Sequence, residues 1–241
     1  MISASEPPLA RPGPTRLVLI GATGLIGGLL AGRLLARGGR AVVQALVRRP
    51  TGRAHERWSE QVAPAADWPG LVAARTADRA VSTLGTTMRS AGSEAAFRAV
   101  DFDMVVAFAA AARRAGARHM VTVSSVGANP RSKNFYLRVK GEMEQAIEAV
   151  GFERLDILRP GLLRGERGPD RRLGERVGIL VSPVVNLFLA GPLERFAAID
   201  ADVVAAAIQA MLRLDEPGTF RHDNRSIRRL AAQTGRNPIP M

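Results

Sequence analysis

Short apolar runs alternate with longer helical patterns along the first two thirds of the chain. Each run is four to seven residues long and ends in glycine, proline or small polar residues, which is typical of buried strands. Strands that alternate with helices indicate βαβ units and a parallel sheet. We therefore predict an α/β fold, with strands at residues 17–20, 41–47, 79–84, 119–123 and 155–159 and a weakly patterned one near 61–64.

Residues 93–115 carry the longest helical pattern. Ser93 is a suitable N-cap, and apolar residues recur behind it at helical spacing; they are Phe97, Val100, Met104, Val105 and Phe108. Asp101 is the polar exception within this stripe. It either supports a functional site or lies at the edge of the exposed face.

A glycine-spaced turn joins the first strand to the first helix, with Gly21, Gly24 and Gly27 three residues apart. The first glycine allows a sharp turn, the second lets a pyrophosphate approach the backbone, and the third lets the helix pack closely. The helix N-terminus then offers N–H groups and a partial positive charge to phosphates. We predict a dinucleotide site here, to which Thr23, Leu25 and Ile26 also contribute.

The second strand ends in Arg48 and Arg49, where dinucleotide folds usually carry a carboxylate for the adenine ribose of NAD. No Asp or Glu occurs between Glu6 and Glu56. Guanidinium groups bind phosphate well, so the two arginines favour NADP(H) over NAD(H). The alternative is two solvated arginines in an arginine-rich chain.

Small polar residues follow the later strands, where ligands bind in an open parallel sheet. Leu84, Gly85 and Thr86 are expected to line the cofactor, although a simple turn would have the same composition. Ser124 and Ser125 end the fifth strand. The sixth strand ends at Arg159 and is closed by Pro160 and Gly161, and these three residues are also expected to contact the cofactor.

Tyr136 and Lys140 lie four residues apart, so a helix would place them side by side. An ammonium near a phenol favours the phenolate. A serine hydroxyl at the neighbouring strand end, from Ser125 or Ser124, could then hold a substrate carbonyl. The chain has one tyrosine and only two lysines among its 34 basic residues, which makes a chance pairing a poor explanation.

The motifs GATGLIG, SS, YLRVK and RPG occur in the order found in the short-chain dehydrogenase/reductase superfamily. Residues 16–167 resemble its atypical branch, related to Tat-interacting-protein-type oxidoreductases and NAD(P)-dependent epimerase-like proteins. The resemblance implies a Rossmann fold, Tyr136 as acid/base, Lys140 on the nicotinamide ribose and Ser125 on the carbonyl, with Ser124 next in line. Asp101 stands where typical members often carry an asparagine, which puts the usual proton relay in doubt.

Composition excludes several other classes. The chain of 241 residues has no cysteine, so disulfides and thiolate chemistry are excluded, and its three histidines have no metal-ligand spacing, so no metal is expected. The formal charge of +12 comes from scattered arginines, which disfavours a nucleic-acid partner. Residues 177–190 are apolar but interrupted, which favours a buried helix over a membrane span or a membrane-surface contact.

These observations predict one Rossmann-type, doubly wound domain over residues 16–241. Residues 1–15 form a disordered lead-in, and residues 161–241 contribute a small cap on the substrate side. The predicted function is a cytoplasmic NADP(H)-dependent oxidoreductase acting on a small carbonyl or alcohol, with homodimerisation left open. A cofactor-binding redox sensor and a nucleotide-sugar epimerase are the alternatives.

Overall fold

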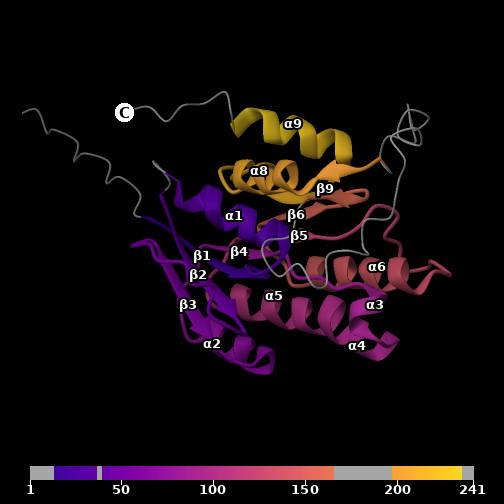
Figure 1. Ribbon diagram of the computed structural model, residues 1–241, viewed down its shortest axis with the longest axis horizontal. Coiled ribbons are helices and arrows are strands. Elements are labelled where there is room, and N and C mark those ends of the chain that lie inside the picture. Colours follow the sequence, from indigo (N-terminus) through magenta and orange to yellow (C-terminus); the bar gives the residue numbers. More distant parts are fainter. Residues whose placement is uncertain (1–13, 37–39, 166–196, 235–241) are drawn as a thin grey trace, which may run out of the picture.

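The computed structural model describes residues 14–36, 40–165 and 197–234. Most of the predicted lead-in, and the loop and apolar helix predicted between 164 and 190, lie outside the described residues apart from Arg164 and Gly165. The described part forms an α/β fold around one parallel sheet, as predicted (Figure 1).

Seven parallel strands form the sheet in the order β3-β2-β1-β4-β5-β6-β9. The reversal from β1 to β4 is the switch point at which doubly wound sheets bind ligands. The strands are β1 (Thr15–Ile20), β2 (Ala41–Val47), β3 (Trp58–Val62), β4 (Arg79–Ser82), β5 (His119–Val123), β6 (Arg154–Leu158) and β9 (Gly218–His222); β7 (Leu163–Arg164) and β8 (Ile199–Asp200) form a separate pair.

Helices cover both faces of the sheet (Figure 1). On one face, α1 (Leu25–Leu35) and α8 (Ala201–Met211) contribute Leu30 and Val204 to a buried apolar layer, with α9 (Asn224–Thr234) packed on α8. On the other, α2 (Trp68–Ala73), α5 (Met104–Arg114) and α6 (Phe135–Glu148) bury Phe108 and Met143.

The predicted helix over residues 93–115 is divided into three pieces. Ser93 is its N-cap, as expected: the Ser93 hydroxyl accepts a hydrogen bond from the Ala96 N–H at 3.1 Å. Helix α4 (Glu94–Arg98) follows, then a π-helical turn (Ala99–Asp103), then α5. The short helix α3 (Met88–Ala91) precedes them and was not predicted.

The seventh strand, β9, was also missed, because residues 218–222 are mostly exposed and show no apolar run. Contacts of the buried Asp156 side chain in β6 help to hold β9 in the sheet. Its carboxylate accepts hydrogen bonds from His119 and His222 at 2.7 Å each and from Arg154, so it ties β5, β6 and β9 together. Burial alone would raise the pKa of Asp156, but these hydrogen bonds outweigh it and hold the pKa well below its usual range.

His119 is held neutral within this network. The Arg79 guanidinium can only donate, and it lies 2.7 Å from Nδ1, so the ring proton resides on Nε2 and is donated to Asp156. Burial lowers the pKa of His119, against the opposing pull of the carboxylate.

The C-terminal part contributes to the core and to the main sheet, which the prediction of a small cap did not include. Helix α8 packs on α1, and β9 extends the main sheet. Buried Asn224 connects this part to the rest, since its side chain accepts from the Gly161 N–H at 2.9 Å and donates to the Ala197 carbonyl at 2.7 Å. The cap over the substrate and the single-domain boundary stay predictions.

Candidate functional site

The glycine turn after β1 is sterically restricted to glycine at two of its three positions. Gly21 has a φ of 86°, and a Cβ there would come within 2.6 Å of Thr83 in the loop after β4. A Cβ on Gly27 would lie 2.1 Å from the Gly21 carbonyl oxygen. The turn, the start of α1 and the loop after β4 are thus packed together at the carboxyl edge of the sheet.

The start of α1 presents backbone N–H groups at this edge. Gly24 is its N-cap and has no side chain to cap the helix, and the first turn contains no acidic residue. The Gly28 N–H donates to the Gly24 carbonyl at 2.8 Å, so the N–H groups of Leu25, Ile26 and Gly27 precede the first bond within the helix. Exposed Thr23 and Gly24 leave the backbone open on the side where a pyrophosphate would approach.

The loop after β4 lies against the glycine turn. The Thr83 N–H and hydroxyl both donate to the Ile20 carbonyl, at 3.0 and 3.2 Å. Leu84, Gly85 and Thr86 follow, with Gly85 exposed. The two segments that were predicted to line the cofactor are therefore adjacent in space.

Arg48 and Arg49 follow β2 directly and are both exposed. A third arginine, Arg53, lies on the same loop and is not among the residues predicted from the sequence. The Arg53 guanidinium donates to the Gly28 carbonyl at 3.2 Å and lies over the Trp58 ring. The sequence shows Arg53 five residues after Arg48. Its contact with α1 could not be predicted, because it depends on how the loop folds back.

Helix α6 carries Tyr136 and Lys140. Its N-cap is Asn134, whose side-chain oxygen accepts from the Leu137 N–H at 3.1 Å. Tyr136 is half-buried and packs against the Phe97 ring at a centroid distance of 5.4 Å. The Lys140 ammonium is buried and forms an ion pair with Asp101 at 2.7 Å. Asp101 is thus buried beside Lys140 and does not lie on the exposed face.

The two candidate serines have different environments. Ser124 is buried and donates its hydroxyl to Glu144 of α6, a carboxylate that also binds Arg159. Ser125 is half-buried, and its hydroxyl donates to the Val126 carbonyl at 3.3 Å. Ser125 is therefore the better placed of the two to meet a substrate, while Ser124 belongs to a buried network.

The residues predicted after β6 also separate. The Arg159 side chain is occupied by Glu144, and the Arg159 N–H donates to the His222 carbonyl at 2.8 Å. The carbonyl of buried Pro160 accepts from the Val126 N–H at 3.0 Å. Arg159 and Pro160 therefore brace the loops around the site, and a direct contact of these residues with a cofactor stays a prediction.

The Ser125 loop packs directly on α6. A Cβ on buried Gly141 would lie 2.3 Å from the backbone of Asn129 and Pro130, so only glycine allows this approach. The Asn129 N–H also donates to the Leu137 carbonyl at 3.0 Å. This explains how a short connection between Ser125 and Tyr136 keeps both at the same edge.

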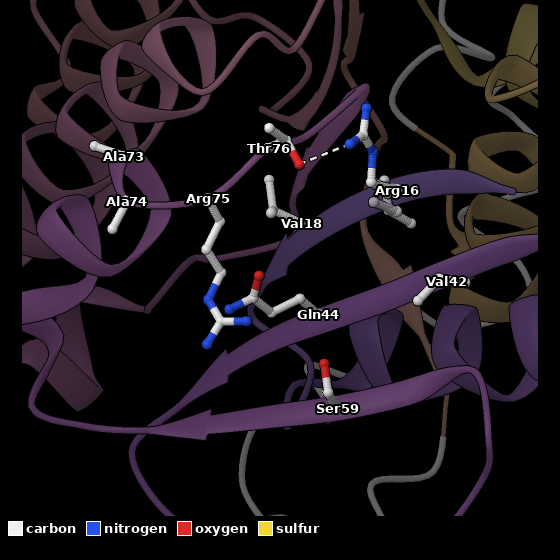
Figure 2. A pocket seen from close by; sticks show the side chains of 10 residues that line it. Arg16, Val18, Val42, Gln44, Ser59, Ala73, Ala74, Arg75 and Thr76 are labelled. Carbon is white, nitrogen blue, oxygen red and sulfur yellow. Dashed lines mark hydrogen bonds between the residues drawn. The ribbon is translucent and has the colours of Figure 1, made fainter. Parts of the chain in front are cut away.

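A cavity of about 550 Å³ lies at the other, amino-terminal edge of the sheet (Figure 2). Its lining includes Arg16, Gln44, Ser59 and Arg75, and none of the predicted site residues. The lining comes from β1, β2 and β3, from the end of α2 and from the segment that follows α2. Ligands of open α/β sheets bind at the carboxyl ends, so we assign the site there.

The fold and the glycine turn define an NAD(P)H-binding Rossmann domain. The sequence profile described as NAD(P)H-binding matches residues 21–179. The chain belongs to this family of atypical short-chain dehydrogenases/reductases, as the sequence motifs had indicated.

Its relatives include the proteins named FMP52, mitochondrial. That of Coccidioides immitis is 35% identical over 175 residues, covering 67% of this chain and 71% of the relative. That of Aspergillus fumigatus is 33% identical over 213 residues, covering 82% and 87%. The prediction of a cytoplasmic location is therefore corrected. The absence of cysteine in the sequence does not identify a compartment, so composition could not have settled this point.

Solved structures support the fold. The Bordetella bronchiseptica enzyme WbmH in complex with NAD⁺ superimposes with a TM-score of 0.64 at 16% identity, covering 87% of this chain and 76% of WbmH. UDP-glucose 4-epimerase of Thermotoga maritima gives 0.62 at 14%, covering 94% and 84%. Within the described residues, every helix is too short or too polar to span a membrane.

Proposed function

We propose that the chain is an NADP(H)-dependent oxidoreductase that reduces a carbonyl or oxidises an alcohol. The observation that carries this proposal is the arrangement of α6. It places half-buried Tyr136 and buried Lys140 on one face, and Lys140 lies against the loop that packs on the glycine turn. This closeness of the proposed acid/base residue to the proposed cofactor loop is what supports the proposal.

The residues present fit a nicotinamide dinucleotide. Gly21 and Gly27 keep the turn compact, and the N–H groups at the start of α1 suit a pyrophosphate. When bound, the cofactor supplies or accepts the hydride. Ser125 orients the carbonyl oxygen by hydrogen bonding, and the Tyr136 hydroxyl gives that oxygen its proton, or removes it in the reverse direction. Lys140 places its ammonium below the cofactor loop, where it can bind the ribose.

Tyr136→Phe tests this role, because it removes the hydroxyl and keeps the ring packed on Phe97. A panel of carbonyl compounds with NADPH is the assay. We expect the wild type to reduce at least one compound and the variant to lose about 10²–10⁴-fold in kcat, the usual contribution of a general acid. Equal turnover by both proteins would show that Tyr136 is not the acid.

The preference for NADP(H) is a second part of the proposal. Arg48 and Arg49 end β2 without a carboxylate beside them, which suits a ribose 2′-phosphate. Replacing both by alanine should weaken NADPH binding by about tenfold or more for each lost contact and leave NADH binding unchanged. Arg75→Ala, exposed at the opposite edge, is the control. Wild-type protein that binds NADH more tightly than NADPH would contradict the proposal.

A cofactor-binding sensor without turnover is the second candidate. It is favoured by the Lys140 ammonium, whose charge is already balanced by Asp101. NADPH binding by a wild type that stays inert across the carbonyl panel would support it. A nucleotide-sugar epimerase is the third candidate. The likeness of this chain to such enzymes is one of fold alone, and nothing in the described residues points to a sugar nucleotide as the ligand.

A further inference from the structure

Two helices meet beside the candidate site through two matched pairs of side chains. Phe97 contacts Tyr136 at a centroid distance of 5.4 Å, and Asp101 lies 2.7 Å from Lys140. Phe97 and Asp101 are four residues apart on one segment, and Tyr136 and Lys140 are four apart on α6. Each segment therefore presents its two residues on one face. The π-helical turn at residues 99–103 carries Asp101, and such turns occur frequently at functional sites.

The Asp101 carboxylate joins two separate elements. Its Oδ1 forms the ion pair with the Lys140 ammonium, and its Oδ2 accepts a hydrogen bond from the Thr86 N–H at 2.8 Å. A Cβ on Gly85 would lie 3.4 Å from Asp101 Oδ1 and 3.8 Å from Lys140 Nζ. The backbone of the proposed cofactor loop therefore runs directly over the pair.

Burial increases the cost of removing the Asp101 carboxylate. The Asp101 side chain is fully buried and that of Lys140 is 5% exposed. A buried charge that loses its partner is strongly destabilised, whereas replacing both partners by neutral groups is often tolerated. An asparagine could still accept from the Thr86 N–H, but it would not balance the ammonium.

We propose that Asp101 is a positioning residue, which fixes the Lys140 ammonium and the Gly85–Thr86 loop as one unit. This inference rests on the proposed function of the same site. It separates two tasks: the negative charge holds Lys140, and the second oxygen holds the loop. Asp101 is in this sense an electrostatic anchor for Lys140 and the loop.

Two variants test these tasks separately. Asp101→Asn keeps an oxygen for Thr86 and loses the charge, so kcat should fall by about a hundredfold, the effect of misplacing a catalytic group. Asp101→Ala loses both, so the Kd for NADPH, measured by nucleotide fluorescence, should also rise by about tenfold. Glu142→Gln is the control, because it breaks the more exposed Arg98–Glu142 pair between the same helices.

The double variant Asp101→Asn with Lys140→Met separates stability from positioning. It leaves no uncompensated charge, so its unfolding midpoint should recover from that of Asp101→Asn, while its kcat should stay low. A double variant that recovers kcat together with stability would overturn the proposal. So would an Asp101→Asn protein with wild-type kcat, or a Glu142→Gln protein that is impaired as strongly.

Failure of the proposed function gives a different result. A wild type that binds NADPH and reduces no carbonyl would refute the oxidoreductase. The anchor is then judged by affinity alone: Asp101→Ala must weaken NADPH binding and Glu142→Gln must not. Equal affinities of the wild type and Asp101→Ala would refute the anchor.

Discussion

Helix α1 contains two glycines at which the same substitution should have opposite effects. A Cβ on Gly27 would lie 2.1 Å from the Gly21 carbonyl oxygen and 2.6 Å from the Thr83 hydroxyl, so backbone must move. Gly32 is exposed, and a Cβ there would meet nothing within 4 Å. Alanine at Gly32 should therefore stabilise the helix by about 0.5–1 kcal/mol.

Alanine at Gly27 gains the same kind of helix propensity but adds an overpacking cost of about 1–3 kcal/mol. The free energy of unfolding should thus be lower in Gly27→Ala than in Gly32→Ala by roughly this amount, as measured by urea denaturation. Gly27→Ala should also bind NADPH more weakly, because the turn must open. Equal stability and equal affinity of the two variants would refute the steric account of the glycine turn.

Three further predictions concern the scaffold. The folded-state pKa of His119 is lowered, so below about pH 6.5 the unfolded chain takes up a proton that the folded protein does not, and the free energy of unfolding should fall. Because the pKa of Asp156 is also lowered, the free energy of unfolding should fall further below about pH 4. Urea denaturation at a series of pH values checks both effects, and a free energy of unfolding that does not change with pH would contradict them. Gly141→Ala should lower the melting temperature, because its Cβ would lie 2.3 Å from the Asn129 backbone; an unchanged value argues against this packing. Asn224→Ala should cost about 1–3 kcal/mol in urea denaturation, since it removes two hydrogen bonds to partly buried backbone groups of Gly161 and Ala197. An unchanged free energy of unfolding would mean that other groups replace its amide.

The strands inside the sheet are the ones that the sequence predicts best. Residues 41–47 and 119–123 match β2 and β5 in full, because each is a short run of mainly apolar residues whose side chains pack into the core. The edge strands differ. β3 lies a few residues before its predicted position, and β9 was missed, because neither needs such a run.

The geometry of the candidate site was predictable where it depends on one short motif. The glycine spacing reflects contacts that are made within the turn itself, and Tyr136 and Lys140 share a helix face. What could not be predicted depends on pairing across the fold. The ion pair of Asp101 with Lys140 spans 39 positions, and the network of Ser124, Glu144 and Arg159 depends on how α6 meets the sheet.

Single-turnover oxidation of bound NADPH, followed by nicotinamide absorbance after adding a carbonyl, tests the central claim most directly. Wild-type protein should oxidise the bound nucleotide, and Tyr136→Phe, loaded to the same extent, should do so about 10²–10⁴-fold more slowly. Equal rates in the two proteins, or bound NADPH that no carbonyl oxidises, would contradict the proposed oxidoreductase.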